Sequence, residues 1–180
     1  MTTPTPNPKQ VADEVVGQAR EAAAVFTQYD QEQVDLIVAA AAKAGAAARI
    51  ELARLAREET GMGVFEDKVI KNLFATEYIY NDIRHLKTVG LVQDCPATGI
   101  LEYAEPLGVI LGIIPVTNPT STTMFKALLA LKTRNSIIIC ASRNASRCSI
   151  AAAKIFYEAA QAAGAPDYVI RRVEEPSREL

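Results

Sequence analysis

The chain has no tryptophan, one histidine and three cysteines among its 180 residues. With His85 alone, and without a CxxC or HxxxH pair, the sequence argues against a transition-metal site built by the protein. The cysteines are Cys95, Cys140 and Cys148. Because their number is odd and their spacing unpaired, we expect free thiols in a reducing cytoplasm.

Excess charge is also missing, since the net charge is -2 and the isoelectric point is about 5.5. Without a basic stripe or a polybasic run, neither nucleic acid nor an anionic membrane is expected as a partner. The longest apolar runs, 107–116 and 137–141, are too short to cross a bilayer. Residues 1–8 lack a basic segment followed by an apolar one, so we expect no secretory signal.

The composition divides the chain into three parts. Residues 1–8 are rich in proline and threonine and are expected to form a disordered tail. Residues 9–104 are expected to form a helical region followed by a β-hairpin. The expected helices are 9–28, 31–59 and 66–85, with Asp30 as an N-cap and the hairpin within 87–104. The side chains expected to face inward on the second and third helices are Val34, Ile37, Val38, Ala41, Ile50, Leu52, Leu55, Val69, Ile70, Leu73, Phe74 and Tyr78.

Residues 105–180 alternate between apolar strands and helices. Strands are predicted at 107–114, 136–141 and 168–173, and helices at 120–132 and 146–163. This order predicts an α/β fold whose three parallel strands lie side by side and are covered on both faces. Three strands make half of a doubly wound nucleotide-binding sheet, so we expect a truncated part of a longer protein. Residues 176–180 resemble the start of another helix.

Asn118 follows the first of these strands and precedes Pro119, which opens a helix. Open α/β sheets bind their ligands at the carboxyl ends of the strands, where helix N-termini offer free N–H groups. From the local sequence, Asn118 could be an N-cap with proline at the first helical position. It could instead direct its amide toward a ligand. Lys126 and Lys132, further along this helix, are expected to be solvated charges.

Several motifs resemble the aldehyde dehydrogenase superfamily, in particular its CoA-acylating branch and the amino-terminal half of the bifunctional aldehyde–alcohol dehydrogenases. The similarity runs from about Val11 to Leu180, almost without gaps. The motifs that carry it are ETGMG at 59–63, EDKVIKN at 66–72, AEPLG at 104–108, VTNPTST at 116–122, FKALLALKTRN at 125–135, AAAKI at 151–155 and AAGAP at 162–166.

This resemblance implies an oxidoreductase that converts an aldehyde, CoA and NAD⁺ to an acyl-CoA and NADH, with acetaldehyde and acetyl-CoA as the expected pair. It implies that the Asn118 amide is the donor that stabilises the developing oxyanion. It also implies a nucleophilic cysteine beyond Leu180, because none of the three cysteines matches that position. Cys148, beside Arg147 near a helix N-terminus, could have a lowered pKa, although a buried thiol is the preferred interpretation.

By the same resemblance, Ile113, Ile114, Pro115 and Val116 would line the nicotinamide side of the NAD⁺ site. Core packing is also expected for Ile113. Ser142 and Arg143 stand where close relatives carry His-Pro, so they could contact the adenosine ribose. Arg143 could instead favour the 2′-phosphate of NADP⁺, or it could be a solvated loop charge.

Two other functions stay open at this point. The chain could be a non-catalytic assembly module or a relic, or a nucleotide-binding half-domain with an unrelated reaction. The resemblance implies a homo-oligomer that associates through the hairpin, and a cytoplasmic location does not exclude a microcompartment. Because a half sheet leaves an open edge and uncovered apolar faces, the isolated chain is expected to self-associate.

Overall fold

The computed structural model describes residues 7–174. The expected tail over residues 1–8 therefore falls largely outside the described residues, and the helix expected at 176–180 falls there entirely. Residue 8 does not belong to a tail, because Pro8 begins the first helix and Asn7 caps it by accepting a hydrogen bond from the backbone N–H of Lys9. Proline suits this position because its missing N–H would have no helical partner.

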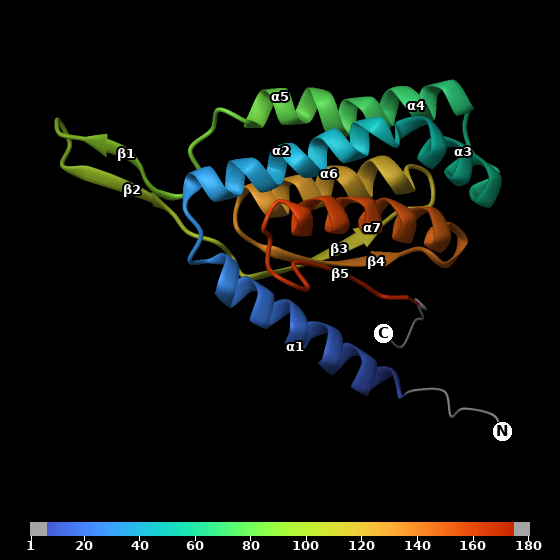
Figure 1. The fold of residues 1–180 in the computed structure, drawn as a ribbon, viewed down its shortest axis with the longest axis horizontal. Coiled ribbons are helices and arrows are strands. Elements are labelled where there is room, and N and C mark those ends of the chain that lie inside the picture. The colour runs from blue at the N-terminus through green and yellow to red at the C-terminus, as the bar shows by residue number, and fades with distance from the viewer. Residues whose placement is uncertain (1–6, 175–180) are drawn as a thin grey trace.

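A three-stranded parallel sheet lies between two layers of helices (Figure 1). Its strands are β3 (Val109–Ile114), β4 (Ser136–Ala141) and β5 (Ile170–Arg172), in that spatial order. The predicted parallel arrangement of three neighbouring strands is confirmed. The helical elements are α1 (Pro8–Phe26), α2 (Gln31–Ala47), α3 (Arg49–Thr60), α4 (Phe65–Leu73), α5 (Ile79–Ile83), α6 (Pro119–Lys132) and α7 (Ser146–Ala162), with a π-helical turn η1 (Phe74–Tyr78) and a 3₁₀ turn η2 (Arg143–Ala145).

The two faces of the sheet are covered unequally. On one face α6 and α7 pack against the strands, and α2 lies over these two helices. On the other face α1 crosses the sheet, with Val15 and Ala19 packed against Ile138 and Val173. The prediction that both faces are covered is confirmed for β4 but is wrong for the carboxyl-terminal part of β3. Val109 packs against the cluster formed with α1, whereas Leu111 and Ile113 are 61% and 66% exposed.

The second predicted helix, 31–59, is wrong in its continuity. The chain bends at Ala48, so that α2 and α3 are separate helices. Asn72 of α4 donates a side-chain hydrogen bond to the carbonyl of Arg49 at 2.9 Å. Neither glycine nor proline stands at position 48, and the hydrogen bond from Asn72 joins the start of α3 to a distant element. The N-cap at Asp30 is confirmed, and a capping box with Gln33 completes it.

The third predicted helix exists, but its inward face is wrong at three of the five expected positions, since only Val69 and Leu73 are half-buried. Ile70, Phe74 and Tyr78 are between 56% and 64% exposed, whereas Asn72 and Thr76 are buried. The buried polar groups are satisfied, since the Thr76 hydroxyl donates to the carbonyl of Asn72 at 2.8 Å. The π-helical turn η1 lies in the middle of this segment. Ile70, Phe74 and Tyr78, which the sequence assigns to the core, therefore form an open apolar surface.

The expected hairpin is confirmed as β1 (Gly90–Cys95) paired antiparallel with β2 (Ile100–Ala104). It projects away from the body of the molecule (Figure 1). Ile100, Leu101 and Tyr103 are each more than half exposed. The hairpin therefore presents apolar side chains at a distance from the core.

Candidate active site

The candidate site is formed by the turn that joins β3 to α6. Asn118 stands at the N-cap position of α6, but its side chain accepts no hydrogen bond from the helix. The N-cap interpretation of its side chain is therefore wrong. Its backbone carbonyl accepts the N–H of Thr122 at 3.1 Å, while its side-chain oxygen accepts a hydrogen bond from the Lys71 ammonium group, also at 3.1 Å. Within residues 7–174, its amide nitrogen donates to no protein acceptor.

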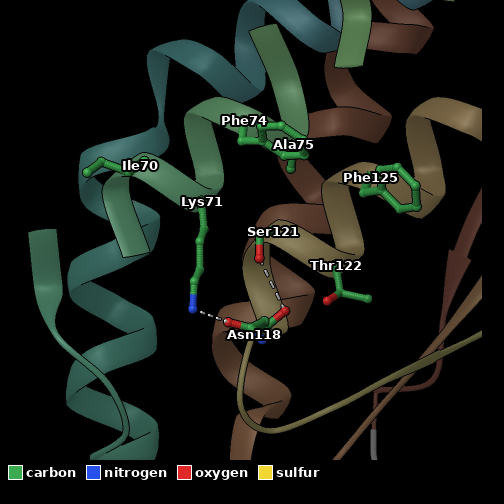
Figure 2. Close-up of a pocket in the computed structure, with 8 residues that line it drawn as sticks. All are labelled: Ile70, Lys71, Phe74, Ala75, Asn118, Ser121, Thr122 and Phe125. Carbon is green, nitrogen blue, oxygen red and sulfur yellow. Dashed lines mark hydrogen bonds between the residues drawn. The ribbon is translucent and has the colours of Figure 1, made fainter. Parts of the chain in front are cut away.

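An open pocket of about 490 Å³ lies beside this asparagine (Figure 2). Lys71 and Asn118 meet at one end of it, and aromatic side chains from η1 and α6 stand further along. Phe74 also stacks on Tyr78, with ring centroids 5.9 Å apart. The full set of lining residues is Ile70, Lys71, Phe74, Ala75, Asn118, Ser121, Thr122 and Phe125. Most of the accessible lining is thus apolar, with an amide and a cation at one place.

Asn118 can be recognised from the sequence, but the walls of this pocket cannot. Ile70 and Phe74 are apolar and follow the helical period, which favours the core. On the buried side of the same helix, Lys68, Asn72 and Thr76 recur at a spacing of four residues. A polar stripe at this spacing opposite an apolar one is ordinarily the solvent-facing side, so the local pattern indicates the wrong face here.

The predicted cofactor residues meet at the carboxyl ends of two neighbouring strands. Ile113 pairs with Cys140 and Ile114 with Ala141 in the parallel register. The backbone N–H of Ser142 donates to the carbonyl of Ile114 at 3.1 Å, which ties the two strand ends together. Arg143 follows in η2 and is exposed.

These residues differ in what they offer to a ligand. Ile113 is 66% exposed, so the expectation that it packs in the core is wrong; alternate residues of β3 face α6, and Ile113 faces the other way. Ile114 is only 1% exposed and belongs to the main core, so its side chain is directed away from any surface site. Pro115 is exposed, and Val116 packs partly against Ala56, Ala145 and Cys148.

Two lysines of α6 also depart from expectation. Lys126 is not simply solvated, because its ammonium group donates to the carbonyl of Ile113 at 2.6 Å. Lys132 is only 2% exposed and forms an ion pair with Asp35. Its ammonium group also donates to the carbonyl of Arg84 at 3.3 Å. Lys126 therefore connects α6 to the end of β3, and Lys132 connects α6 to α2 and to the residue that follows α5.

The cysteines lie outside the pocket. Cys148 is buried, and the lowered pKa considered for it is wrong. Burial, followed by the hydrogen bond with Glu59 and its negative charge, raises the pKa of Cys148 to about 12. A thiol of this kind is almost entirely protonated near neutral pH and is a poor nucleophile. Cys95 and Cys140 are half-buried on β1 and β4.

In residues 7–174, no group of three or more His, Cys, Asp or Glu side chains is arranged to hold a metal ion. Among the helices described, none combines the length and the apolar character required to span a membrane.

Comparisons with known proteins agree on one family. The sequence model of the aldehyde dehydrogenase family matches residues 2–180. Aldehyde-alcohol dehydrogenase from Clostridium acetobutylicum is 51% identical over 168 residues, which cover 93% of this chain and 20% of that protein. The chain thus spans about a fifth of the length of this curated relative.

Solved structures share the fold as well. An acetylating aldehyde dehydrogenase from Geobacillus thermoglucosidasius superimposes with a TM-score of 0.91 at 40% identity, over 96% of this chain and 39% of the other. Propionaldehyde dehydrogenase from Rhodopseudomonas palustris, solved with bound CoA and an acylated cysteine, gives a TM-score of 0.80 at 30% identity. That match covers 93% of this chain and 38% of the other.

Proposed function

The chain belongs to the aldehyde dehydrogenase family, and we propose that it is part of an NAD-dependent, CoA-acylating enzyme. The reaction consumes an aldehyde, CoA and NAD⁺ and yields an acyl-CoA, NADH and a proton. The relatives named above, an aldehyde-alcohol dehydrogenase and an acetylating aldehyde dehydrogenase, support this reaction. Because the chain spans about a fifth of the first relative, the activity is proposed for the whole protein to which these residues belong.

The observation that carries the proposal is the Asn118 amide at the end of an apolar pocket. When a thiolate adds to an aldehyde, the carbonyl oxygen gains negative charge, and a donor fixed near it lowers the barrier. The amide nitrogen of Asn118 has no other partner in the described part of the chain, so it is available as that donor. The thiolate itself is proposed to come from a cysteine outside this chain, since the pocket lining contains none.

The residues at the two strand ends fit a dinucleotide. Bound NAD⁺ would supply the hydride acceptor for the oxidation of the aldehyde carbon. Ile113 and Pro115 offer exposed apolar surface beside the strand end, where a nicotinamide ring could pack. Ser142 and Arg143 offer polar groups for the adenosine ribose, and Arg143 also suits the extra phosphate of NADP⁺. Ile114 and Val116 would support this surface from beneath, rather than touch the ring.

A small aldehyde suits the pocket, because its lining is largely apolar and its polar groups gather at one end. We propose acetaldehyde as the substrate, in line with the acetylating relative. We also propose a homo-oligomer that associates through the exposed apolar side chains of the β1–β2 hairpin. The three free cysteines suit a reducing cytoplasm.

The test is the formation of NADH, followed at 340 nm, by the full-length gene product with acetaldehyde, CoA and NAD⁺. We expect turnover that requires CoA and forms acetyl-CoA in equal amount. A parallel assay with NADP⁺ measures whether the enzyme accepts the 2′-phosphate. NADH formation that does not require CoA would contradict the acylating reaction. Binding of NAD⁺ without turnover of acetaldehyde or propionaldehyde would favour the half-domain with an unrelated reaction, and absence of both would favour an assembly module or relic.

A further inference from the structure

Three side chains of helix α4 form hydrogen bonds with the turn that joins β3 to α6 and with the first residues of α6. The Lys68 ammonium group donates to the carbonyl of Thr117 at 3.1 Å. One turn later, the Lys71 ammonium group donates to the side-chain oxygen of Asn118, also at 3.1 Å. Asn72 accepts the hydroxyl of Thr120 at 2.8 Å. Two residues of the turn, Thr117 and Asn118, and Thr120 in the first turn of α6 are thus each bound by the same helix.

The three contacts differ in their environment. Asn72 is 1% exposed and Lys68 is 6% exposed, so they bind the backbone and the first helical turn from within the protein. Burial and the nearby positive charge of Lys71 lower the pKa of Lys68. Lys71 is exposed and lines the pocket, with its ammonium group directed at the asparagine (Figure 2). Lys68 and Asn72 therefore support the turn, while Lys71 contacts the group proposed to act in the reaction.

We propose that Lys71 is a positioning residue that fixes the orientation of the Asn118 amide, so that its N–H₂ group faces the reacting aldehyde oxygen. This inference rests on the proposed function. The two ends of a side-chain amide have nearly the same shape, and the hydrogen-bond network decides which is oxygen and which is nitrogen. An ammonium group only donates hydrogen bonds, so it selects the amide oxygen.

The reverse orientation is unfavourable for two reasons. It would set the amide N–H₂ against the Lys71 ammonium group, donor against donor, and it would turn the amide oxygen toward the negative charge that develops in the reaction. No other described side chain donates to the Asn118 amide oxygen. The cation beside the amide oxygen also polarises the amide and strengthens its N–H groups as donors. Among the described residues, Lys71 therefore makes the contact that favours one orientation of the Asn118 amide over the other.

The experiment uses four variants of the full-length gene product: Lys71→Met, Lys71→Arg, Asn118→Ala and the double variant Lys71→Met/Asn118→Ala. Lys43→Met is the matched control, since Lys43 is exposed on α2 and does not line the pocket. We expect Lys71→Met to lower kcat by about 10- to 100-fold, part of the roughly 10²- to 10³-fold value of such a donor. The KM values for acetaldehyde and CoA should change by less than about twofold, because an orienting contact acts in the transition state.

Lys71→Arg should recover most of kcat, since a guanidinium group also only donates. The double variant should be no slower than Asn118→Ala alone, because a residue that acts through Asn118 has nothing left to orient. Additive losses would overturn the proposal, as would a KM for CoA or aldehyde that rises while kcat is kept. Either result would mean that Lys71 binds a substrate directly.

A second measurement does not depend on turnover. Crystal structures of the wild type and Lys71→Met at better than about 1.2 Å resolution would distinguish the amide nitrogen from the oxygen by its hydrogens, without reference to assumed partners. We expect one orientation in the wild type and a reversed or mixed amide in the variant. An unchanged amide in Lys71→Met would overturn the proposal even if the wild type is inactive. Inactivity of the wild type with an amide that depends on Lys71 would refute only the proposed function.

Discussion

The carboxylate of Glu59, the penultimate residue of α3, accepts a hydrogen bond from the backbone N–H of Cys148 at 2.7 Å. Its other oxygen accepts the N–H of Arg147 at 2.8 Å. These N–H groups belong to the first turn of α7, which has no side-chain cap of its own. Glu59 therefore caps a helix whose bound N–H groups lie 88 and 89 residues further along the chain, and its charge lies where a helix N-terminus favours an anion.

The same carboxylate has a consequence for the Cys148 thiol. With a pKa raised to about 12 by burial and by Glu59, the thiol should resist alkylation at pH 8, while Cys95 and Cys140 react faster. Mass spectrometry after a timed iodoacetamide treatment measures each site. Glu59→Gln should lower the pKa and speed the reaction at Cys148. Rapid alkylation of Cys148 in the folded wild type would contradict this assignment.

The raised pKa also predicts how stability depends on pH. Above the ordinary thiol pKa of 9.0, the unfolded chain loses a proton that the folded chain keeps until about pH 12. The unfolded state then binds fewer protons, so stability falls as pH rises. The contribution is complete below about pH 9 and disappears toward pH 12. The unfolding midpoint of Cys148→Ala should therefore change less between pH 8.5 and 10.5 than that of the wild type.

Gly45 shows how closely α2 approaches its neighbours. A Cβ atom at this position would lie 2.4 Å from Cε2 of Phe156 and 2.8 Å from Cγ2 of Thr76. Gly45→Ala should therefore cost about 1–3 kcal/mol of stability, despite the better helix propensity of alanine. Gly17 in α1 is the matched control, because nothing lies within 4 Å of a Cβ built there.

Gly17→Ala should raise stability by about 0.5–1 kcal/mol. Thermal unfolding of both variants and the wild type under one condition gives the comparison. Equal effects of the two substitutions would contradict the close packing of α2 on α7 and η1.

The buried ion pair of Lys132 with Asp35 should respond differently to the loss of each partner. Asp35→Ala leaves an ammonium group that is 2% exposed with only the carbonyl of Arg84 as a described partner. Lys132→Met leaves a carboxylate that is 41% exposed and can be hydrated. Loss of one partner of a buried pair typically costs about 3–5 kcal/mol, and a well-packed apolar replacement much less.

We therefore expect Asp35→Ala to be more destabilising than Lys132→Met, measured by urea unfolding of the same protein. Because Asp35 is partly exposed, we expect the difference in unfolding free energy between the two variants to be below about 5 kcal/mol, the upper end of the range for a buried pair. A larger loss in Lys132→Met would mean that the aliphatic part of Lys132, rather than its charge, stabilises this region.

Much of the fold could be predicted from the sequence, because its signals are local. The apolar strands and the helices after Glu105 follow from period and length, and Asp30 is an N-cap by residue type. The bend at Ala48 and the buried face of α4 could not be predicted in this way. Asn72 contributes to both through its hydrogen bonds with Arg49 and Thr120 across the fold. A local pattern contains no record of such long-range partners.

For the site, the sequence and its family resemblance identified Asn118 but not what surrounds it. The side chain could be read as a cap or as a donor to a ligand, and only the geometry removes the cap. Nothing local distinguishes Lys68 from a solvated lysine. The contacts of Lys68 and Lys71 with the turn join positions 47 to 49 residues apart.

The isolated 180-residue chain should self-associate. Leu111 and Ile113 on β3 and Phe74 on η1 are each more than half exposed, and β3 is an edge strand of the sheet. Exposed apolar surface beside an unpaired strand edge favours association between copies. Size-exclusion chromatography with light scattering should give a mass above that of one chain, and Leu111→Lys should reduce it. A dilute, verified monomer with a cooperative thermal transition would contradict this expectation.

Substitutions at Asn118 separate the loss of a donor from the introduction of a negative charge. In the full-length gene product, Asn118→Ala should lower kcat by about 10²- to 10³-fold, the usual value of one oxyanion donor. Asn118→Asp should lower it further, because a carboxylate repels the developing oxyanion and pairs with the Lys71 ammonium group. Asn81→Ala, on the exposed face of α5, is the control for the substitution itself. If Asn118→Ala stays within about threefold of the wild-type rate, another group stabilises the oxyanion. If Asn118→Asp is the faster of the two variants, the site favours a positive rather than a negative charge in the transition state.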